Sequence, residues 1–228
     1  MIDKRVDSIE AALIDVRDGA SVMISGFGGA GTPANLMRGL DACGAKDLTV
    51  IVNSLRFLEG QAPGLFAEKR VKKAVCTAAR GRGKTPSDYE LQWQAGELDI
   101  DMCPQGTFAE RIRAGGAGIP AFYTPTAAGV ELGKGKELRL FDGRPCVLET
   151  SLRADFAIMR GAEADRFGNV RFRGSQANFG MAMAPAADVA IVEVQAFSET
   201  PLAPEDIDLP GVYVQRIVLA PDTGEIRG

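Results

Sequence analysis

The chain has no histidine among its 228 residues. Without an imidazole it lacks the commonest general base, the usual partner of a serine or cysteine nucleophile, and the commonest neutral metal ligand. We therefore expect no metal site. Any chemistry must use carboxylates, thiols or amides, or a group that another chain supplies.

Cysteine is scarce, and long apolar runs are absent. No stretch reaches the roughly 18 apolar residues that a membrane span needs, and the first six residues are charged and amphipathic, unlike a signal peptide. These features predict a cytoplasmic protein that is neither exported nor embedded in a membrane. The cysteines lie far apart, without the paired spacing of a disulfide framework or a zinc site; they are Cys43, Cys76, Cys103 and Cys146.

The charge of the chain argues against nucleic acid as a partner. Its formal net charge is −4 and its pI is about 5.1, whereas a nucleic-acid-binding domain typically has a pI above about 9. The hydrophobic content of 46% is enough for an ordinary core, and no polar linker or internal repeat divides the sequence. We expect one domain over residues 1–228.

Apolar periodicity predicts alternating strands and helices in the first half of the chain. We expect helices over residues 6–16 and 33–40, the second capped by Thr32, and a capping box of Ser87 with Glu90 marks a further helix start. The expected strands cover residues 22–24, 48–52, 71–78 and 98–102. Strand, helix and strand in this order favour a parallel sheet.

The second half is richer in strands. A capping box of Thr107 with Glu110 predicts one more helix, followed by a Gly/Pro-rich loop over residues 113–120. The Asp142-Gly143 pair predicts a hairpin turn, and later strands are expected over residues 156–159 and 189–194. The predicted fold is α/β: an open, largely parallel sheet with flanking helices and a strand-rich C-terminal half.

A glycine-rich turn follows the first buried strand and precedes the helix at Pro33. Its glycines permit positive φ angles and close approach of a ligand to backbone N–H groups, and the positive end of the following helix favours a phosphate or carboxylate. The turn consists of Ser25, Gly26, Phe27, Gly28, Gly29, Ala30 and Gly31. We expect these residues to bind a ligand.

The spacing of the glycines also fits the dinucleotide fingerprint, Gly26-x-Gly28-x-x-Gly31. Two details speak against NAD: Pro33 places the helix start after the third glycine, and the next strand ends at Asn53-Ser54 in place of an acidic residue. Three alternatives remain for the chain and its glycine turn. The protein could be a nucleotide-dependent oxidoreductase or a non-catalytic sugar-phosphate or effector sensor, or the glycines could simply permit a tight strand-to-helix crossing.

The turn and several later segments resemble the A subunit of the two-subunit 3-oxoacid CoA-transferases. The longest match is the run from Pro104-Gln105-Gly106-Thr107-Phe108 to Phe122-Tyr123-Thr124-Pro125-Thr126, and similarity covers nearly the whole chain. Further matches are Asp18-Gly19, Asp155-Phe156-Ala157, Asp165-Arg166, Gly168-Asn169-Val170, Ala177-Asn178-Phe179 and Pro210-Gly211-Val212-Tyr213. The short glycine loop resembles the 3-oxoadipate branch more than the acetoacetate branch.

Three segments depart from the family pattern. Ser25 stands where the family usually has a second glycine, Asn53-Ser54-Leu55-Arg56 replaces Asn-Asn-Ala-Gly, and Ala127-Ala128-Gly129-Val130 follows Pro125-Thr126 in place of Gly-Tyr-Gly-Thr. We expect these changes to affect the identity of the acid substrate more than the fold.

The resemblance implies CoA transfer from succinyl-CoA to a 3-oxoacid, either 3-oxoadipate or acetoacetate, through a glutamyl-CoA intermediate. In the family the reactive glutamate lies in a Glu-Asn-Gly triplet of the B subunit, and this chain contains no such triplet. We therefore expect a B subunit as partner in a heterodimer or heterotetramer, no catalytic residue in this chain, and a CoA thioester as substrate without a permanently bound cofactor. Glu149 and Glu193 are the nearest internal candidates for the nucleophile.

The resemblance also assigns roles to side chains outside the turn. Residues 25–31 would contact CoA, while Gln105 would donate its amide to a substrate carboxylate or acyl oxygen; a turn residue that caps the following helix is the alternative for Gln105. Asn53 and Tyr123 are further substrate-binding candidates. Arg111 and Arg113 could meet phosphates, although charges on a helix surface usually face water.

Overall fold

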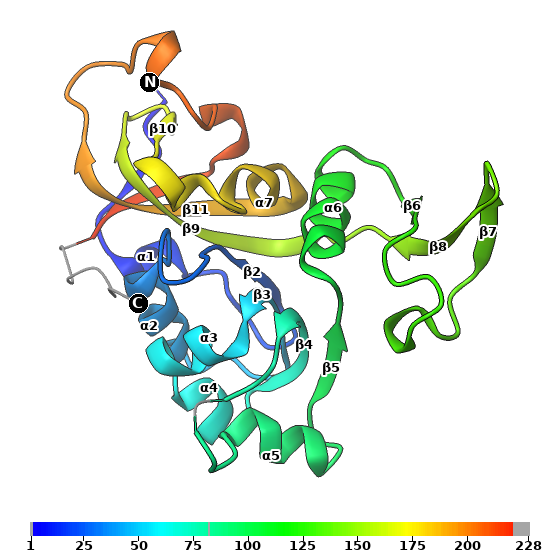
Figure 1. Cartoon of the computed structure of the whole chain (residues 1–228). Helices are drawn as coiled ribbons and strands as arrows, with labels where there is room; N and C mark the ends of the chain where they lie inside the picture. Colours follow the sequence, from blue (N-terminus) through cyan, green and yellow to red (C-terminus); the bar gives the residue numbers. More distant parts are fainter. Residues whose placement is uncertain (1, 82, 221–228) are drawn as a thin grey trace.

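The computed structural model describes residues 2–81 and 83–220, and its centre is a nine-stranded sheet (Figure 1). The strand order is β1-β12-β11-β9-β2-β3-β4-β5, with β10 paired to β9. Every neighbouring pair is parallel except β10 with β9. The strands are β1 Arg5–Val6, β2 Ser21–Ile24, β3 Leu48–Ser54, β4 Val71–Ala78, β5 Asp99–Met102, β9 Ala154–Ala164, β10 Val170–Arg171, β11 Ala187–Phe197 and β12 Arg216–Leu219. This arrangement confirms the predicted α/β class.

Both faces of this sheet are covered, which explains the short apolar runs in its central strands, such as residues 22–24 of β2 and 50–52 of β3. Val22 and Ile24 of β2 belong to one buried cluster, whereas Met23 between them belongs to the other. The first cluster includes side chains of α1 Ile9–Ala12, α2 Ala34–Ala42, α3 Leu55–Gln61, α4 Gly64–Ala67 and α5 Asp88–Gln94. The second lies under α6 Gln105–Gly116 and α7 Gly180–Ala186.

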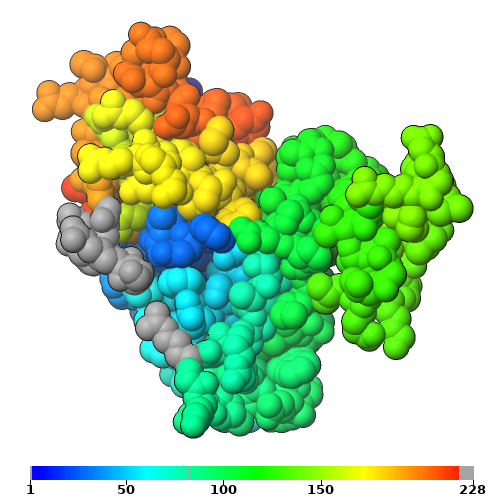
Figure 2. Space-filling model, viewed as in Figure 1, coloured from blue at the N-terminus to red at the C-terminus, as the bar shows by residue number. Residues whose placement is uncertain are grey.

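A separate three-stranded antiparallel sheet, in the order β6-β8-β7, projects from the side of the molecule beyond α6 (Figures 1 and 2). Its strands are β6 Ala121–Thr124, β7 Leu138–Phe141 and β8 Arg144–Thr150. The predicted hairpin turn is confirmed, since Asp142 and Gly143 join β7 to β8 with φ angles of 49° and 74°. Positive φ at both central residues is the requirement of the hairpin turn that Asp-Gly favours.

The predicted helix over residues 6–16 is wrong. Val6 lies in β1, where it pairs with Val218 of β12, and the helix is limited to Ile9–Ala12. Ser8 sets its start, because the Ser8 hydroxyl accepts a hydrogen bond from the Ala11 N–H at 3.1 Å. Pairing with a strand near the other end of the chain has overridden the local helical pattern.

The helix starts were predicted with mixed success. The Ser87–Glu90 capping box is confirmed at α5, where the Ser87 N–H donates to the Glu90 carboxylate at 2.9 Å. The Thr107–Glu110 box is wrong, because α6 already begins at Gln105 and Thr107 is buried inside it. Thr32 is also not the cap of α2, whose N-cap residue is Pro33.

The loop expected over residues 113–120 begins later than predicted, since α6 continues to Gly116. At Gly115 a Cβ would overlap the Leu152 carbonyl oxygen, so the missing side chain lets the helix pack directly on the chain before β9. Glycine here serves helix packing and not a loop. Among the described residues, no helix combines the length and apolarity needed to cross a bilayer.

Candidate functional site

The glycine turn emerges at the carboxyl end of β2 and forms a tight hairpin. The Phe27 N–H donates to the Ala30 oxygen and the Ala30 N–H donates to the Phe27 oxygen, both at 3.0 Å. Phe27 and Gly28 are exposed at its tip. Within the described residues, the N–H groups of Gly28 and Gly29 make no hydrogen bond, so the tip presents two free donors.

The base of the turn is fixed from two sides. The buried Ser25 hydroxyl donates to the Gly31 oxygen at 2.9 Å, and the Gly26 N–H donates to the Asn178 side-chain oxygen at 3.1 Å. A Cβ on Gly31 would lie 2.5 Å from the Gln176 oxygen, so this glycine permits close packing on the segment before α7. Figure 2 shows the blue early segment reaching the surface between the yellow segment near residue 175 and the cyan segment near residue 60.

The sequence led us to expect that the positive end of α2 favours a phosphate or carboxylate of a ligand, but this helix end is already occupied. A carboxylate of the chain itself occupies it: Glu193 Oε2 accepts the Leu36 N–H at 2.9 Å, and Arg160 lies 3.6 Å from the other oxygen. Glu193 is completely buried. Burial raises the pKa of Glu193 above its usual 4.5, and the Leu36 N–H and Arg160 oppose this shift. Ligand binding by this loop must therefore rely on the turn itself.

Asn53 follows on the neighbouring strand, near the carboxyl end of β3. It is buried, and its side-chain oxygen accepts a hydrogen bond from the Thr77 hydroxyl of β4 at 2.9 Å. Its amide nitrogen donates to no group among the described residues. Thr77 was not singled out from the sequence, because only the pairing of β3 with β4 places it against Asn53.

Gln105 lies at the start of α6, directly after β5. The Cys103 N–H donates to the Cys76 oxygen at 3.0 Å, which continues the β4–β5 pairing up to this point. Gln105 is exposed, and its side chain makes no hydrogen bond within the described chain. It does not cap α6, so the helix-capping alternative is wrong. The glycine turn after β2, Asn53 at the end of β3 and Gln105 after β5 thus lie at one edge of the sheet.

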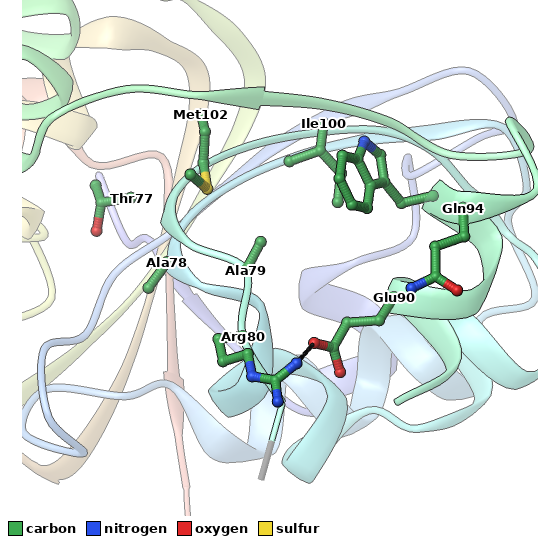
Figure 3. A pocket seen from close by; sticks show the side chains of 9 residues that line it. Thr77, Ala78, Ala79, Arg80, Glu90, Gln94, Ile100 and Met102 are labelled. Atoms are coloured by element: carbon green, nitrogen blue, oxygen red, sulfur yellow. Dashed lines mark hydrogen bonds and ion pairs between the residues drawn. The ribbon is translucent and has the colours of Figure 1, made fainter. Parts of the chain in front are cut away.

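A cleft of about 520 Å³ opens at the same edge between β4, β5 and α5 (Figure 3). Thr77, Ile100, Met102 and Trp93 line it, and an ion pair of Arg80 with Glu90 at 3.0 Å lies on one side. Its size falls in the range of ligand pockets, roughly 300–1,000 Å³. Thr77, which lines the cleft, also donates its hydroxyl to the Asn53 side chain. The cleft lies near the glycine turn, because two strand spacings, about 10 Å, separate β4 from β2.

Tyr123 is not brought together with the other candidates. It lies on β6 of the projecting sheet, on the far side of α6 from β2 (Figure 1). Its hydroxyl donates to Glu137 at 2.6 Å, a hydrogen bond that raises the pKa of Tyr123 and lowers that of Glu137. Substrate binding by Tyr123 stays a prediction.

The remaining charged candidates make contacts within the chain. Glu149 is buried and paired with Lys136. Arg111 is also buried, and its guanidinium donates to the Thr150 oxygen at 2.8 Å and to Asp101 at 3.2 Å. Arg113 is exposed and pairs with Glu110.

Comparison with known proteins identifies this architecture. An acyl-CoA transferase apoenzyme from Escherichia coli O157:H7 superposes with a TM-score of 0.80 over 99% of this chain and 48% of that chain, at 20% identity. The fold is therefore that of CoA-transferases. The family model described as coenzyme A transferase matches residues 6–220, and the chain belongs to this family.

Two relatives show how far the similarity extends. The A subunit of a 3-oxoadipate CoA-transferase from Pseudomonas putida is 44% identical over 219 residues, which cover 96% of this chain and 94% of the relative. A mitochondrial succinyl-CoA:3-ketoacid coenzyme A transferase 2A from Rattus norvegicus is 42% identical over 229 residues, or 92% of this chain but only 43% of that protein. The resemblance seen in the sequence is confirmed, and the chain spans less than half of the rat relative.

Proposed function

We propose that this chain is the subunit without the nucleophile in a cytoplasmic CoA-transferase that moves CoA from succinyl-CoA to a 3-oxoacid, 3-oxoadipate or acetoacetate. The observation that carries the proposal is the end-to-end match to the A subunit of a 3-oxoadipate CoA-transferase. The same sequence covers 43% of the rat 3-ketoacid enzyme. The remaining part of the site would come from a B subunit in a heterodimer or heterotetramer.

The reaction needs a carboxylate nucleophile, and we assign it to the B subunit because this chain contains no Glu-Asn-Gly triplet. A glutamate of the B subunit attacks the acyl-CoA thioester and expels CoA thiolate, which leaves an acyl-glutamyl anhydride. The thiolate then attacks the glutamyl carbonyl of the anhydride and releases the first acid as its carboxylate. The glutamyl-CoA thioester passes CoA to the second acid by the reverse steps. Glu149 and Glu193 are unsuited to this role, because both are buried and ion-paired.

The role that we assign to this chain is to stabilise negative charge on the reacting carbonyl oxygens. Each attack on a thioester or anhydride places charge on an oxygen, and fixed hydrogen-bond donors lower the barrier to such steps. The free N–H groups of Gly28 and Gly29, the amide nitrogen of Asn53 and the side chain of Gln105 are donors without partners in the described chain. We assign the turn to the CoA thioester, and Asn53 and Gln105 to the acid.

The cleft beside Thr77 is large enough to hold part of a substrate. Ile100, Met102 and Trp93 offer apolar contact, and Thr77 at the end of the cleft donates its hydroxyl to Asn53. We propose that an apolar part of the substrate occupies it, with the reacting carbonyl toward Asn53.

CoA transfer from succinyl-CoA to 3-oxoadipate and to acetoacetate, measured for this chain alone and with its B subunit, tests the proposal. We expect activity only when both subunits are present. An inactive complex with every 3-oxoacid would refute the transferase assignment. A thermal-shift response to NAD(P) with none to CoA would favour the oxidoreductase alternative.

A further inference from the structure

We propose that Asn178 is a positioning residue that holds the glycine turn in its reactive geometry. The inference rests on the proposed function, because it concerns how the free N–H groups of Gly28 and Gly29 are aimed at a thioester. Asn178 lies between the short 3-10 helix Gly174–Ala177 and α7.

The side chain of Asn178 binds both ends of the turn. Its oxygen accepts the Gly26 N–H at 3.1 Å, and its nitrogen donates to the Ala30 oxygen at 3.0 Å. These two residues flank the exposed tip. Among the described residues, Asn178 is the one side chain from outside residues 25–31 that hydrogen-bonds to this segment. The turn is otherwise tied by its own bonds and by the Ser25 N–H to the Ile158 oxygen.

The amide of Asn178 is itself rigidly held. The oxygen also accepts the Phe179 N–H at 2.7 Å, and the nitrogen also donates to the Ser175 oxygen at 2.9 Å. The group thus uses both donors and two acceptor positions, the full set expected of a well-ordered asparagine amide. Its fixed orientation is transmitted to the turn.

Asparagine suits this role because one planar amide presents an acceptor and a donor side by side. Aspartate would keep the acceptor for Gly26 but would lose the donors to Ala30 and Ser175. Alanine would lose all four hydrogen bonds. The packing agrees with this, since a Cβ on Gly31 would lie 2.8 Å from the Asn178 nitrogen. Only a glycine lets the amide approach so closely.

Kinetics of the complex with the B subunit test the inference, with Asn178→Ala and Asn178→Asp as variants. A misplacement of about 1 Å at a reacting centre costs about 10²-fold in rate, so we expect kcat to fall about 10²-fold, with a much smaller change in the KM for succinyl-CoA. Hydrogen–deuterium exchange of the segment 25–31 should speed up in Asn178→Ala.

Asn169→Ala is the matched control. Asn169 also bridges two segments, accepting the Gly211 N–H at 2.8 Å and donating to Asp165 at 2.9 Å, without touching the glycine turn. We expect its kcat per folded enzyme to stay within about threefold of the unsubstituted complex, since structural losses far from the site act on stability.

The outcomes separate the inference from the function on which it rests. A normal kcat in Asn178→Ala, or an equal loss in Asn169→Ala, would overturn the positioning role. An unsubstituted complex without CoA transfer would overturn the proposed function and the catalytic part of the inference. In that case, unchanged hydrogen–deuterium exchange of residues 25–31 in Asn178→Ala would show that Asn178 does not hold the turn either. Faster exchange would support only the structural part of the inference, that Asn178 holds the turn.

Discussion

Glu193 Oε2 accepts a hydrogen bond from the Leu36 N–H at 2.9 Å, so a buried carboxylate of β11 caps the first turn of α2. The two residues are 157 positions apart in the sequence. The contact joins the strand-rich second half to the helix that follows the glycine turn. It also explains why this helix end is closed to an external phosphate.

This contact predicts a large stability loss in Glu193→Ala. Removal of the carboxylate leaves the buried Leu36 N–H without its acceptor, and an unsatisfied buried donor typically costs about 1–3 kcal/mol. Glu193→Gln should cost less, since its amide oxygen still accepts the Leu36 N–H. Urea unfolding monitored by circular dichroism measures both free energies of unfolding. Equal losses in the two variants would contradict the capping role.

The raised pKa of Glu193 predicts a pH dependence with a definite sign. The folded protein keeps this proton above pH 4.5, the usual value, where the unfolded chain loses it. The part of the stability that comes from keeping this proton is therefore complete below 4.5 and is lost as the pH rises through the raised pKa, while the hydrogen bond from the Leu36 N–H remains. Glu193→Gln does not titrate, so its stability relative to wild type should increase with pH over this window. A constant difference in unfolding free energy would contradict the shift.

Arg111 and Arg113 form a matched pair on α6. Arg111 is buried and hydrogen-bonded to Thr150 and Asp101, so Arg111→Ala should lower the free energy of unfolding by about 1–3 kcal/mol. Arg113 is exposed, and the Arg113→Ala change should stay within about 0.5 kcal/mol. Chemical denaturation of both variants checks this. Comparable stabilities would show that Arg111 is not a structural residue.

Two glycines of α6 should respond in opposite directions to alanine. Gly115→Ala places a methyl group against the Leu152 carbonyl and should destabilise the protein by about 1–3 kcal/mol. A Cβ on Gly106 meets nothing within 4 Å, so Gly106→Ala should stabilise the helix by about 0.5–1 kcal/mol. The melting temperatures of the two variants, compared with that of the unsubstituted protein, test both predictions. A tolerated Gly115→Ala would mean that α6 does not pack on this segment as described.

Gln105→Ala separates a substrate-binding role from a structural one. Because the side chain makes no hydrogen bond within the described chain, stability should change by no more than about 0.5 kcal/mol. Loss of one donor to a developing oxyanion should lower kcat about 10²-fold in the complex with the B subunit. A variant with normal turnover would remove Gln105 from the site.

The sequence predicts the local and periodic parts of this molecule well. The buried strands β2 and β3 carry short apolar runs, residues 22–24 and 50–52, and the Asp142-Gly143 turn and the Ser87 capping box depend on neighbouring residues alone. The family follows from motifs of contiguous residues such as Pro104-Gln105-Gly106.

What the sequence does not predict depends on contacts between distant segments. Val6 is drawn into β1 by a strand near the end of the chain, and Asn178 meets Gly26 across 152 residues. Neither contact produces a periodic pattern in the sequence. For the same reason the capping of α2 by Glu193 and the pairing of Asn53 with Thr77 become visible only in the folded chain.

We propose that the reacting glutamate comes from the B subunit and not from this chain. Intact-mass spectrometry of the complex after incubation with succinyl-CoA, in the absence of an acceptor acid, tests it most directly. We predict that the B subunit gains the mass of a covalently bound CoA and that this chain keeps its unmodified mass. A CoA adduct on this chain would show instead that one of its own carboxylates is the nucleophile.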